Sequence, residues 1–249
     1  MNNEGTGNQK RATKMYCTLI ITRYPKHLGF FGFLSMALFR FPLWFDKKIK
    51  FWKLMGSGKN GTFDLKPDLN QWAVLFTSNE KMTCLPAFIN VYWKFFRCDL
   101  KQITMQPVEG HGLWDGKEVF GPLKPKSDYG GPVAVLTRAT IRLKRLQNFW
   151  SNVNSVADEM SSAEGFIISY GIGELPWIKQ ATFSVWKDKT SMKAFAYNTH
   201  HHSDVIRKTR RENWYKEEMF VRFRIISVNG FSQDIVAKLC NLQPSYEEA

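Results

Sequence analysis

Hydrophobic and polar positions along the chain fall into two blocks that predict the same order of elements. In the first block, strands are expected at 17–24, 50–58, 71–77 and within 94–105, with helices at 29–41 and around 81–91. In the second block, strands are expected at 132–142, 165–173, 180–187 and 218–227, with helices at 143–160, 188–197 and 200–213. Each block therefore follows the order β-α-β-β-α-β.

A repeated β-α-β-β-α-β order is typical of two ferredoxin-like halves packed sheet to sheet. We expect an α+β protein whose halves form a pseudo-dimeric α+β barrel, with space for a large apolar ligand in its interior or in a helix–sheet gap. The predicted division is a disordered tail at 1–14, an N-terminal half at 15–106, a Gly- and Pro-rich connector at 107–131, a C-terminal half at 132–228 and an extension at 229–249.

The segment 28–45, "LGFFGFLSMALFRFPLWF", is strongly apolar. Arg40 and Pro42 interrupt it before the roughly 20 clean residues that a membrane span needs, so a buried or interfacial helix is predicted. The basic stretch "DKKIKFWK" follows directly. An apolar helix beside positive charge is typical of peripheral membrane contact, which makes 28–53 a candidate docking surface.

Composition limits the classes of partner and the compartment that we expect for this chain. The chain has 249 residues, a formal charge of +13 and 15% aromatic residues. This charge favours anionic partners, but zinc-finger spacing and RNA-binding aromatic signatures are absent, so we expect no nucleic acid. The four cysteines stand far apart, which disfavours zinc and iron–sulfur sites and suits a reduced compartment. The polar start carries no secretory pattern, so we expect a cytoplasmic protein, with peripheral contact at the inner membrane.

The run "THHHSDVIRK" holds three of the five histidines. If a helix begins near Thr199, one apolar stripe contains His202, Val205, Ile206 and Thr209. Adjacent helical side chains point about 100° apart, so the three imidazoles do not converge on one zinc ion. A single inward imidazole is compatible with haem, although a hydrogen-bonded core histidine has the same spacing. His111 and His27 lie in predicted loops, where histidines are usually solvated, although the glycine-rich loop of His111 could reach a site.

The second half contains the stretches "GGPVAVLTRATIR", "YGIGELPWIKQATFSVWKD", "MKAFAY" and "HSDVIRKTRRENWYKEEMFVRF", and the first half contains "FWKLMGSGKNGTF" and "DLNQWAVLFT". Together these stretches resemble the spheroidene monooxygenase family, the acyclic carotenoid 2-ketolases, and those of the second half are the most specific. The resemblance runs from about residue 17 to 226. It implies a haem-dependent enzyme that uses O₂ and reduced ferredoxin to oxidise a methylene of an acyclic carotenoid to a ketone through two successive hydroxylations.

The resemblance also implies roles for particular residues. The family's histidine falls on His202, which would be the axial ligand of the haem iron, although His200 and His201 beside it leave the choice of ligand open. The family's Trp-aromatic-x-Glu-Glu element falls on Trp214, Glu217 and Glu218. Either glutamate could orient the histidine from the next strand.

Three arginines are candidates for holding the haem propionates, because guanidinium groups suit carboxylates. Arg207 and Arg211 follow His202 on the predicted helix, where they could equally form a solvated basic face. Arg138 lies within the matching strand "LTRATIR". Four aromatic residues are candidates for the cavity wall or for plain core: Phe183, Trp186, Phe195 and Trp214. The alternative function on this fold is a non-catalytic protein that binds haem or another apolar ligand.

Overall fold

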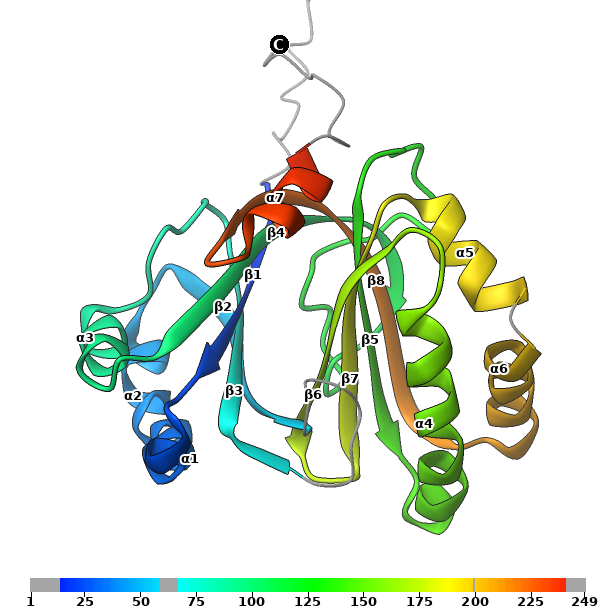
Figure 1. Ribbon diagram of the computed structural model, residues 1–249, viewed down its shortest axis with the longest axis horizontal. Coiled ribbons are helices and arrows are strands. Elements are labelled where there is room, and N and C mark those ends of the chain that lie inside the picture. The colour runs from blue at the N-terminus through cyan, green and yellow to red at the C-terminus, as the bar shows by residue number, and fades with distance from the viewer. Residues whose placement is uncertain (1–13, 59–66, 199, 241–249) are drawn as a thin grey trace, which may run out of the picture.

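A computed structural model describes residues 14–58, 67–198 and 200–240. Its eight strands form a closed barrel in the order β1-β3-β2-β6-β7-β5-β8-β4, and every neighbouring pair is antiparallel (Figure 1). The strands are β1 (Tyr16–Arg23), β2 (Ile49–Gly58), β3 (Pro67–Ser78), β4 (Asp99–Gly112), β5 (Val133–Ile141), β6 (Phe166–Leu175), β7 (Lys179–Trp186) and β8 (Tyr215–Asn229).

The barrel consists of two halves with the same strand order. The N-terminal half runs β4-β1-β3-β2 and the C-terminal half runs β8-β5-β7-β6. The halves join at a long β4–β8 pairing and at a short β2–β6 pairing that contains Gly56↔Gly173 and Ser57↔Ile172. This arrangement confirms the predicted α+β barrel of two ferredoxin-like halves.

The helices cover the outside of the barrel in two groups (Figure 1). The N-terminal half carries α1 (Gly29–Leu38), α2 (Arg40–Phe45) and α3 (Ala87–Phe95), and the C-terminal half carries α4 (Leu146–Ser161), α5 (Lys189–Asn198) and α6 (His200–Glu212). A last helix, α7 (Gln233–Cys240), lies at one end of the barrel and buries Leu239 in the central core.

Strand alternation divides the core into an interior and two outer layers. Side chains such as Leu19, Leu136 and Phe183 fill the barrel interior and are fully buried. Their neighbours on the same strands point outward and pack under the helices, because successive strand side chains face opposite sides. At Gly32 on α1, an added Cβ would lie 2.3 Å from the indole nitrogen of Trp72 on β3. Glycine therefore allows α1 to lie directly on the sheet.

The structure corrects three predicted boundaries. Helical structure in the apolar segment continues as α2 to Phe45. The helix predicted around 81–91, α3, starts only at Ala87. Pro86 disfavours helical geometry in the residue before it, so the helix does not extend further toward the N-terminus. Strand β4 extends to Gly112, into the segment that the Gly and Pro content marked as a connector, because β8 pairs with it from Gln102 to Gly112. Helix α7 was not predicted within the extension.

Candidate active-site cavity

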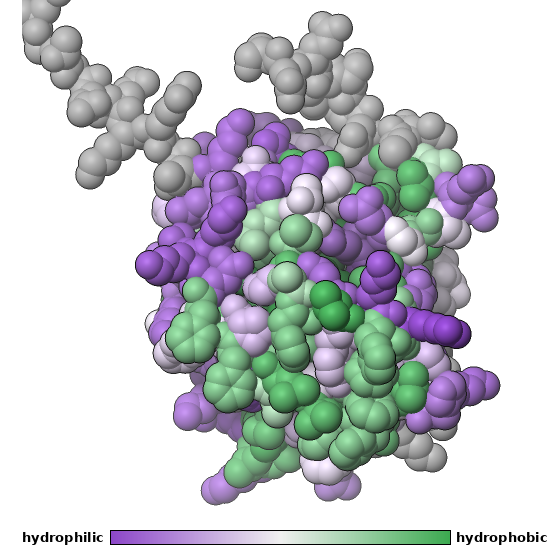
Figure 2. Space-filling model, turned by 90° about the vertical axis from the view of Figure 1, so that its left-hand side faces the viewer, coloured by the Kyte–Doolittle hydropathy of each residue, from purple (hydrophilic) through white to green (hydrophobic). Residues whose placement is uncertain are grey.

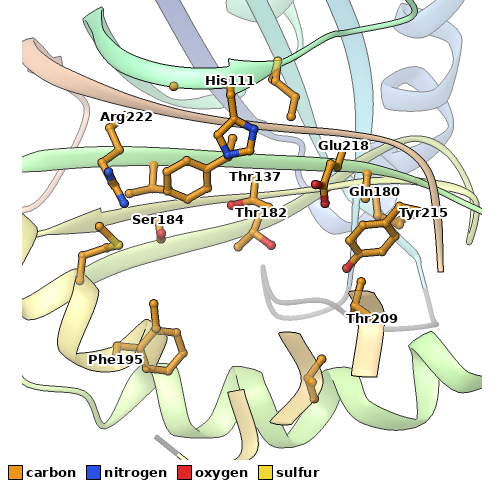
Figure 3. Close-up of a pocket in the computed structure, with 18 of the residues that line it drawn as sticks. His111, Thr137, Gln180, Thr182, Ser184, Phe195, Thr209, Tyr215, Glu218 and Arg222 are labelled. Carbon is orange, nitrogen blue, oxygen red and sulfur yellow. The ribbon is translucent and has the colours of Figure 1, made fainter. Parts of the chain in front are cut away.

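A cavity of about 420 Å³ lies between the outer face of the C-terminal sheet and helices α4, α5 and α6 (Figure 3). Its volume falls within the range of small-molecule sites. The helix–sheet gap is thus one of the two places where the sequence predicted a ligand space. The other, the barrel interior, is filled by the central core.

Strand alternation selects the residues that form the sheet side of the cavity. On β5, Thr137 and Ala139 face the cavity, whereas Leu136 belongs to the barrel core. Strand β7 lies beside β5 in register, with Thr137 opposite Thr182. The sheet side therefore carries a row of hydroxyl groups, from Thr137, Thr182 and Ser184 (Figure 3).

The helix side of the cavity is mainly apolar. Helix α4 contributes Phe149 and Met160, and α5 contributes Met192 and Phe195. Such a wall excludes water and tolerates an irregular apolar ligand, because methionine adapts its shape. An apolar wall facing a few fixed polar groups is the usual composition of a ligand site.

His111 reaches the cavity from the N-terminal half. It lies near the end of β4, opposite Phe220 of β8, and its ring stacks on that of Phe220. Figure 3 shows its imidazole projecting into the cavity. The sequence pattern did not predict a strand at this position, because Pro107 and Gly110 break the strand alternation and indicate a loop. Among the described residues, His111 is the one histidine whose side chain lines the cavity.

Arg222 lies near His111 at the cavity edge (Figure 3). Its Nη1 donates to Glu109, whose carboxylate also accepts from Lys189 Nζ at 3.2 Å and from the Ser127 amide at 2.6 Å. Burial raises the pKa of Glu109, but these hydrogen bonds and the two cations outweigh it and leave the pKa below its ordinary value. Within the described structure the buried Arg222 Nε has no partner, which leaves one guanidinium donor for a ligand.

The other end of the cavity contains Tyr215, Glu218 and Gln180 (Figure 3). Burial raises the pKa of Tyr215 to about 12, so its phenol is neutral near pH 7 and can donate a hydrogen bond. The two family-matched glutamates are separated by strand alternation. Glu218 lines the cavity, whereas Glu217 faces the barrel interior and binds Arg138.

Helix α6 carries the predicted iron ligand. The backbone of His202 lies in α6, and its side chain lies outside the part of the structure that is described, as do those of His200 and His201. Val205 and Thr209 follow position 202 by three and seven residues and line the cavity. This spacing repeats on one helix face.

The arginines predicted near haem propionates lie in different surroundings. Arg207 is exposed, and Arg211 is exposed and lies 3.6 Å from the Glu212 carboxylate. Neither is among the cavity-lining residues, whereas Arg210 on the same helix is. Arg210 was not among the residues predicted at the site, because it lies outside the apolar stripe of the helix.

Arg138, the third arginine predicted near haem propionates, does not line this cavity. It lies on the opposite face of β5, 1% exposed, and its guanidinium pairs with Glu217, with Asp115 at 2.8 Å and with Glu174 at 3.6 Å. Lys53 and Lys179 complete this interior charge cluster by binding Asp115. The charge in the apolar strand is thus explained by three carboxylates from other segments of the barrel.

The candidate aromatic residues divide between wall and core. Trp186 and Phe195 line the cavity and stack on each other, with ring centroids 5.2 Å apart. Phe183 is fully buried in the barrel interior, and Trp214 packs beside Ile141 and Phe149. Over the described residues, no group of three or more His, Cys, Asp or Glu is placed to hold a metal ion.

Sequence comparison identifies the family. No family model matches the chain. The spheroidene monooxygenase of Rhodobacter capsulatus is 34% identical over 203 residues, which cover 79% of this chain and 83% of that protein. This chain belongs to the spheroidene monooxygenase family. The family's Cereibacter sphaeroides member is 34% identical over 205 residues, which cover 80% of this chain and 63% of that longer protein.

Structure comparison shows that the fold of this spheroidene monooxygenase family member also occurs in solved structures of low sequence identity. A solved aldoxime dehydratase in complex with butyraldoxime has a TM-score of 0.60 and covers 87% of this chain and 81% of its own, at 8% identity. At that identity the likeness concerns the barrel alone. Activity therefore has to be inferred from the family and from the site.

Proposed function

We propose that the protein is a haem-dependent monooxygenase that converts a methylene near the end of an acyclic, spheroidene-like carotenoid to a ketone. Two successive hydroxylations at one carbon, followed by loss of water, would use O₂ and electrons from reduced ferredoxin. The observation that carries the proposal is the cavity itself. The segments with the most specific family resemblance, in β5, β7, α5, α6 and β8, supply most of the residues that line it.

The residues around the cavity fit a haem. Helical spacing directs position 202 to the same side of α6 as Val205 and Thr209, which supports His202 as the iron ligand. The apolar wall suits the macrocycle, and Arg210 and Arg222 are cations at the cavity for the propionate carboxylates. When bound, the haem would activate O₂ for insertion into a C–H bond.

The chain's own groups would control orientation and protons. His111 enters from the strand side, whereas position 202 lies on the helix side, so His111 is the candidate to hold or donate a proton during oxygen chemistry. The hydroxyl row and the neutral Tyr215 phenol can orient a polar product group. Met160, Met192 and Phe195 would keep the carotenoid end away from water.

The cavity volume restricts how the substrate binds. A space of about 420 Å³ accommodates a small-molecule ligand, whereas a carotenoid is a long polyene. Only the chain end with the reacting methylene would enter. Electrons would come from a separate donor, and the formal charge of +13 suits an acidic ferredoxin.

The test is product formation in a host that makes acyclic carotenoids and supplies ferredoxin and its reductase. The wild-type chain should yield a keto-carotenoid, detected by liquid chromatography and mass spectrometry, and His202→Ala should abolish it at equal protein level. A wild-type protein that binds haem but yields no oxidised carotenoid would support the alternative, a non-catalytic haem or apolar-ligand protein. Formation of ketone by the His202→Ala variant would refute the assigned iron ligand.

A further inference from the structure

The helices of the N-terminal half carry a large apolar surface (Figure 2). Trp44, Phe45 and Phe95 are each more than three-quarters exposed, at 78%, 76% and 77%. The remaining members are at least half exposed. We call this surface the aromatic patch: Phe30, Phe33, Phe41, Trp44, Phe45, Phe88, Val91 and Phe95. An exposed apolar patch rimmed by polar residues usually marks an interaction site.

The aromatic patch is continuous because α1, α2 and α3 pack side by side. The rings of Phe31 and Phe96 stack with centroids 4.4 Å apart, and the Tyr92 hydroxyl donates to the Phe31 carbonyl at 2.8 Å. Beneath the patch, Phe39 contacts Phe88 edge to face. Segments from two separate parts of the chain thus present one surface, shown together in Figure 2.

Positive charge surrounds the aromatic patch. The segments 26–50 and 81–98 contain eight lysines and arginines and a single acidic residue, Asp46. All eight of these cations are exposed, and one of them, Lys48, pairs with Glu80 at 3.2 Å. Purple residues border the green patch in Figure 2. Apolar side chains with a basic collar match the two layers of an anionic lipid leaflet, its acyl region and its headgroups.

The structure argues against a membrane-spanning arrangement of this segment. Lys26–Phe45 is long and apolar enough to cross a membrane, and 28% of it is buried within the protein. Phe39 and Leu43 within it are fully buried in a core that includes Val74 and Phe76 of β3. Crossing a bilayer would remove those side chains from that core. Pairing of the patch with a second copy would bring two basic collars together, which like-charge repulsion opposes.

We propose that the aromatic patch inserts into the headgroup–acyl boundary of an anionic bilayer while the basic collar binds lipid headgroups. The protein then lies on the membrane with α1, α2 and α3 beneath it. The patch is on the half of the barrel that faces away from α4–α6 and the cavity (Figure 1). Membrane docking therefore does not depend on what the cavity binds.

The test is flotation with phosphatidylcholine vesicles that contain or lack about a third phosphatidylglycerol. The wild-type chain should float with the anionic vesicles, less at high salt, and should be released by alkaline carbonate. The triple variant Phe41→Ser, Trp44→Ser, Phe45→Ser should lose roughly tenfold or more in partitioning, since each change removes a large apolar area. The matched variant with Leu at the same three positions should still bind.

The contribution of the basic collar and the depth to which the aromatic patch inserts are tested separately. Lys47→Glu with Lys50→Glu should weaken binding to anionic vesicles, whereas the same reversal at Lys187 and Lys193, exposed in the C-terminal half, should not. Brominated lipid should quench wild-type tryptophan fluorescence more than that of Trp44→Phe. Absence of wild-type binding, equal binding of the Ser triple variant, or a stable dimer in light scattering that this variant dissociates would each overturn the proposal.

Discussion

The imidazole of His111 lies against the ring of Phe220, with centroids 5.9 Å apart and planes 23° from parallel. These residues belong to β4 and β8, the strands that join the two halves along their longest pairing. The cavity lies in the C-terminal half, yet this junction supplies it with a titratable group from the N-terminal half. The site therefore depends on closure of the whole barrel.

Replacement of His111 by Ala should lower the rate of carotenoid oxidation by about 10²-fold, since a positioned proton donor contributes about that much or more. The ring is exposed at the cavity, so folding and haem binding should be retained. Turnover with reduced ferredoxin, measured beside the haem spectrum, checks the prediction. His27→Ala, an exposed histidine before α1, is the control. Unchanged turnover in His111→Ala would remove this residue from the reaction.

Filling the cavity should block the substrate without disturbing the barrel interior. Ala139 is buried on β5 and faces the cavity. We expect Ala139→Phe to lower ketone formation at least roughly tenfold, because the added ring occupies space that the carotenoid end needs. Ala139→Ser, which adds little volume, should keep most of the activity. Equal product from the Phe variant at matched protein level would place the substrate elsewhere.

Arg138→Met should destabilise the fold by about 3–5 kcal/mol, because it removes the cation that compensates Glu217, Asp115 and Glu174. Urea unfolding followed by circular dichroism measures this loss. Arg211→Met, whose side chain is 77% exposed, should change stability by less than about 0.5 kcal/mol. Similar losses in the two variants would contradict a structural role for the interior charge cluster.

The same cluster predicts acid sensitivity. Burial raises the pKa of Glu217. The Gly116 and Asp115 amides and the Arg138 guanidinium lower it by more than burial raises it, so the pKa lies below its ordinary value of 4.5. Asp115 is shifted in the same direction, mainly by Lys179 and Lys53 against its burial. A lowered folded-state pKa stabilises the protein above the ordinary value, and this stability is lost as pH falls through the folded-state pKa.

The melting temperature should therefore fall as pH is lowered below about 4.5, where an unfolded carboxyl begins to take up protons. Glu217→Gln should be less stable near pH 7 and show a shallower fall. Calorimetry between pH 3 and 7 measures both. A variant with the full wild-type pH dependence would show that Glu217 does not contribute to it.

The local pattern of the sequence was sufficient to predict all eight strands and the order of helices and strands within each half. Periodicity reports which face of an element is apolar, and the strands here have clear apolar faces. It does not report pairing between distant strands, so it could not predict the β4–β8 junction or the extension of β4 to Gly112.

The same limit explains the results at the site. Alternation predicts that Glu217 and Glu218 face opposite sides, but only the folded barrel shows which side holds the cavity. Arg138 was conspicuous as a charge in an apolar strand, yet its partners come from loop and strand residues distant in sequence. His111 was hidden by Pro107 and Gly110, whose local signal indicates a loop. Helical spacing, by contrast, correctly predicted that Val205 and Thr209 share the cavity side of α6.

The most direct measurement of the central claim is the absorption spectrum of the purified protein after haem loading, oxidised and reduced. We predict a Soret band for the wild type that is lost in His202→Ala and retained in His200→Ala, His201→Ala and His111→Ala. Each variant is compared at equal protein concentration, with circular dichroism to verify folding. A wild-type protein that binds no haem, or a His202→Ala variant that keeps the wild-type band, would contradict the account.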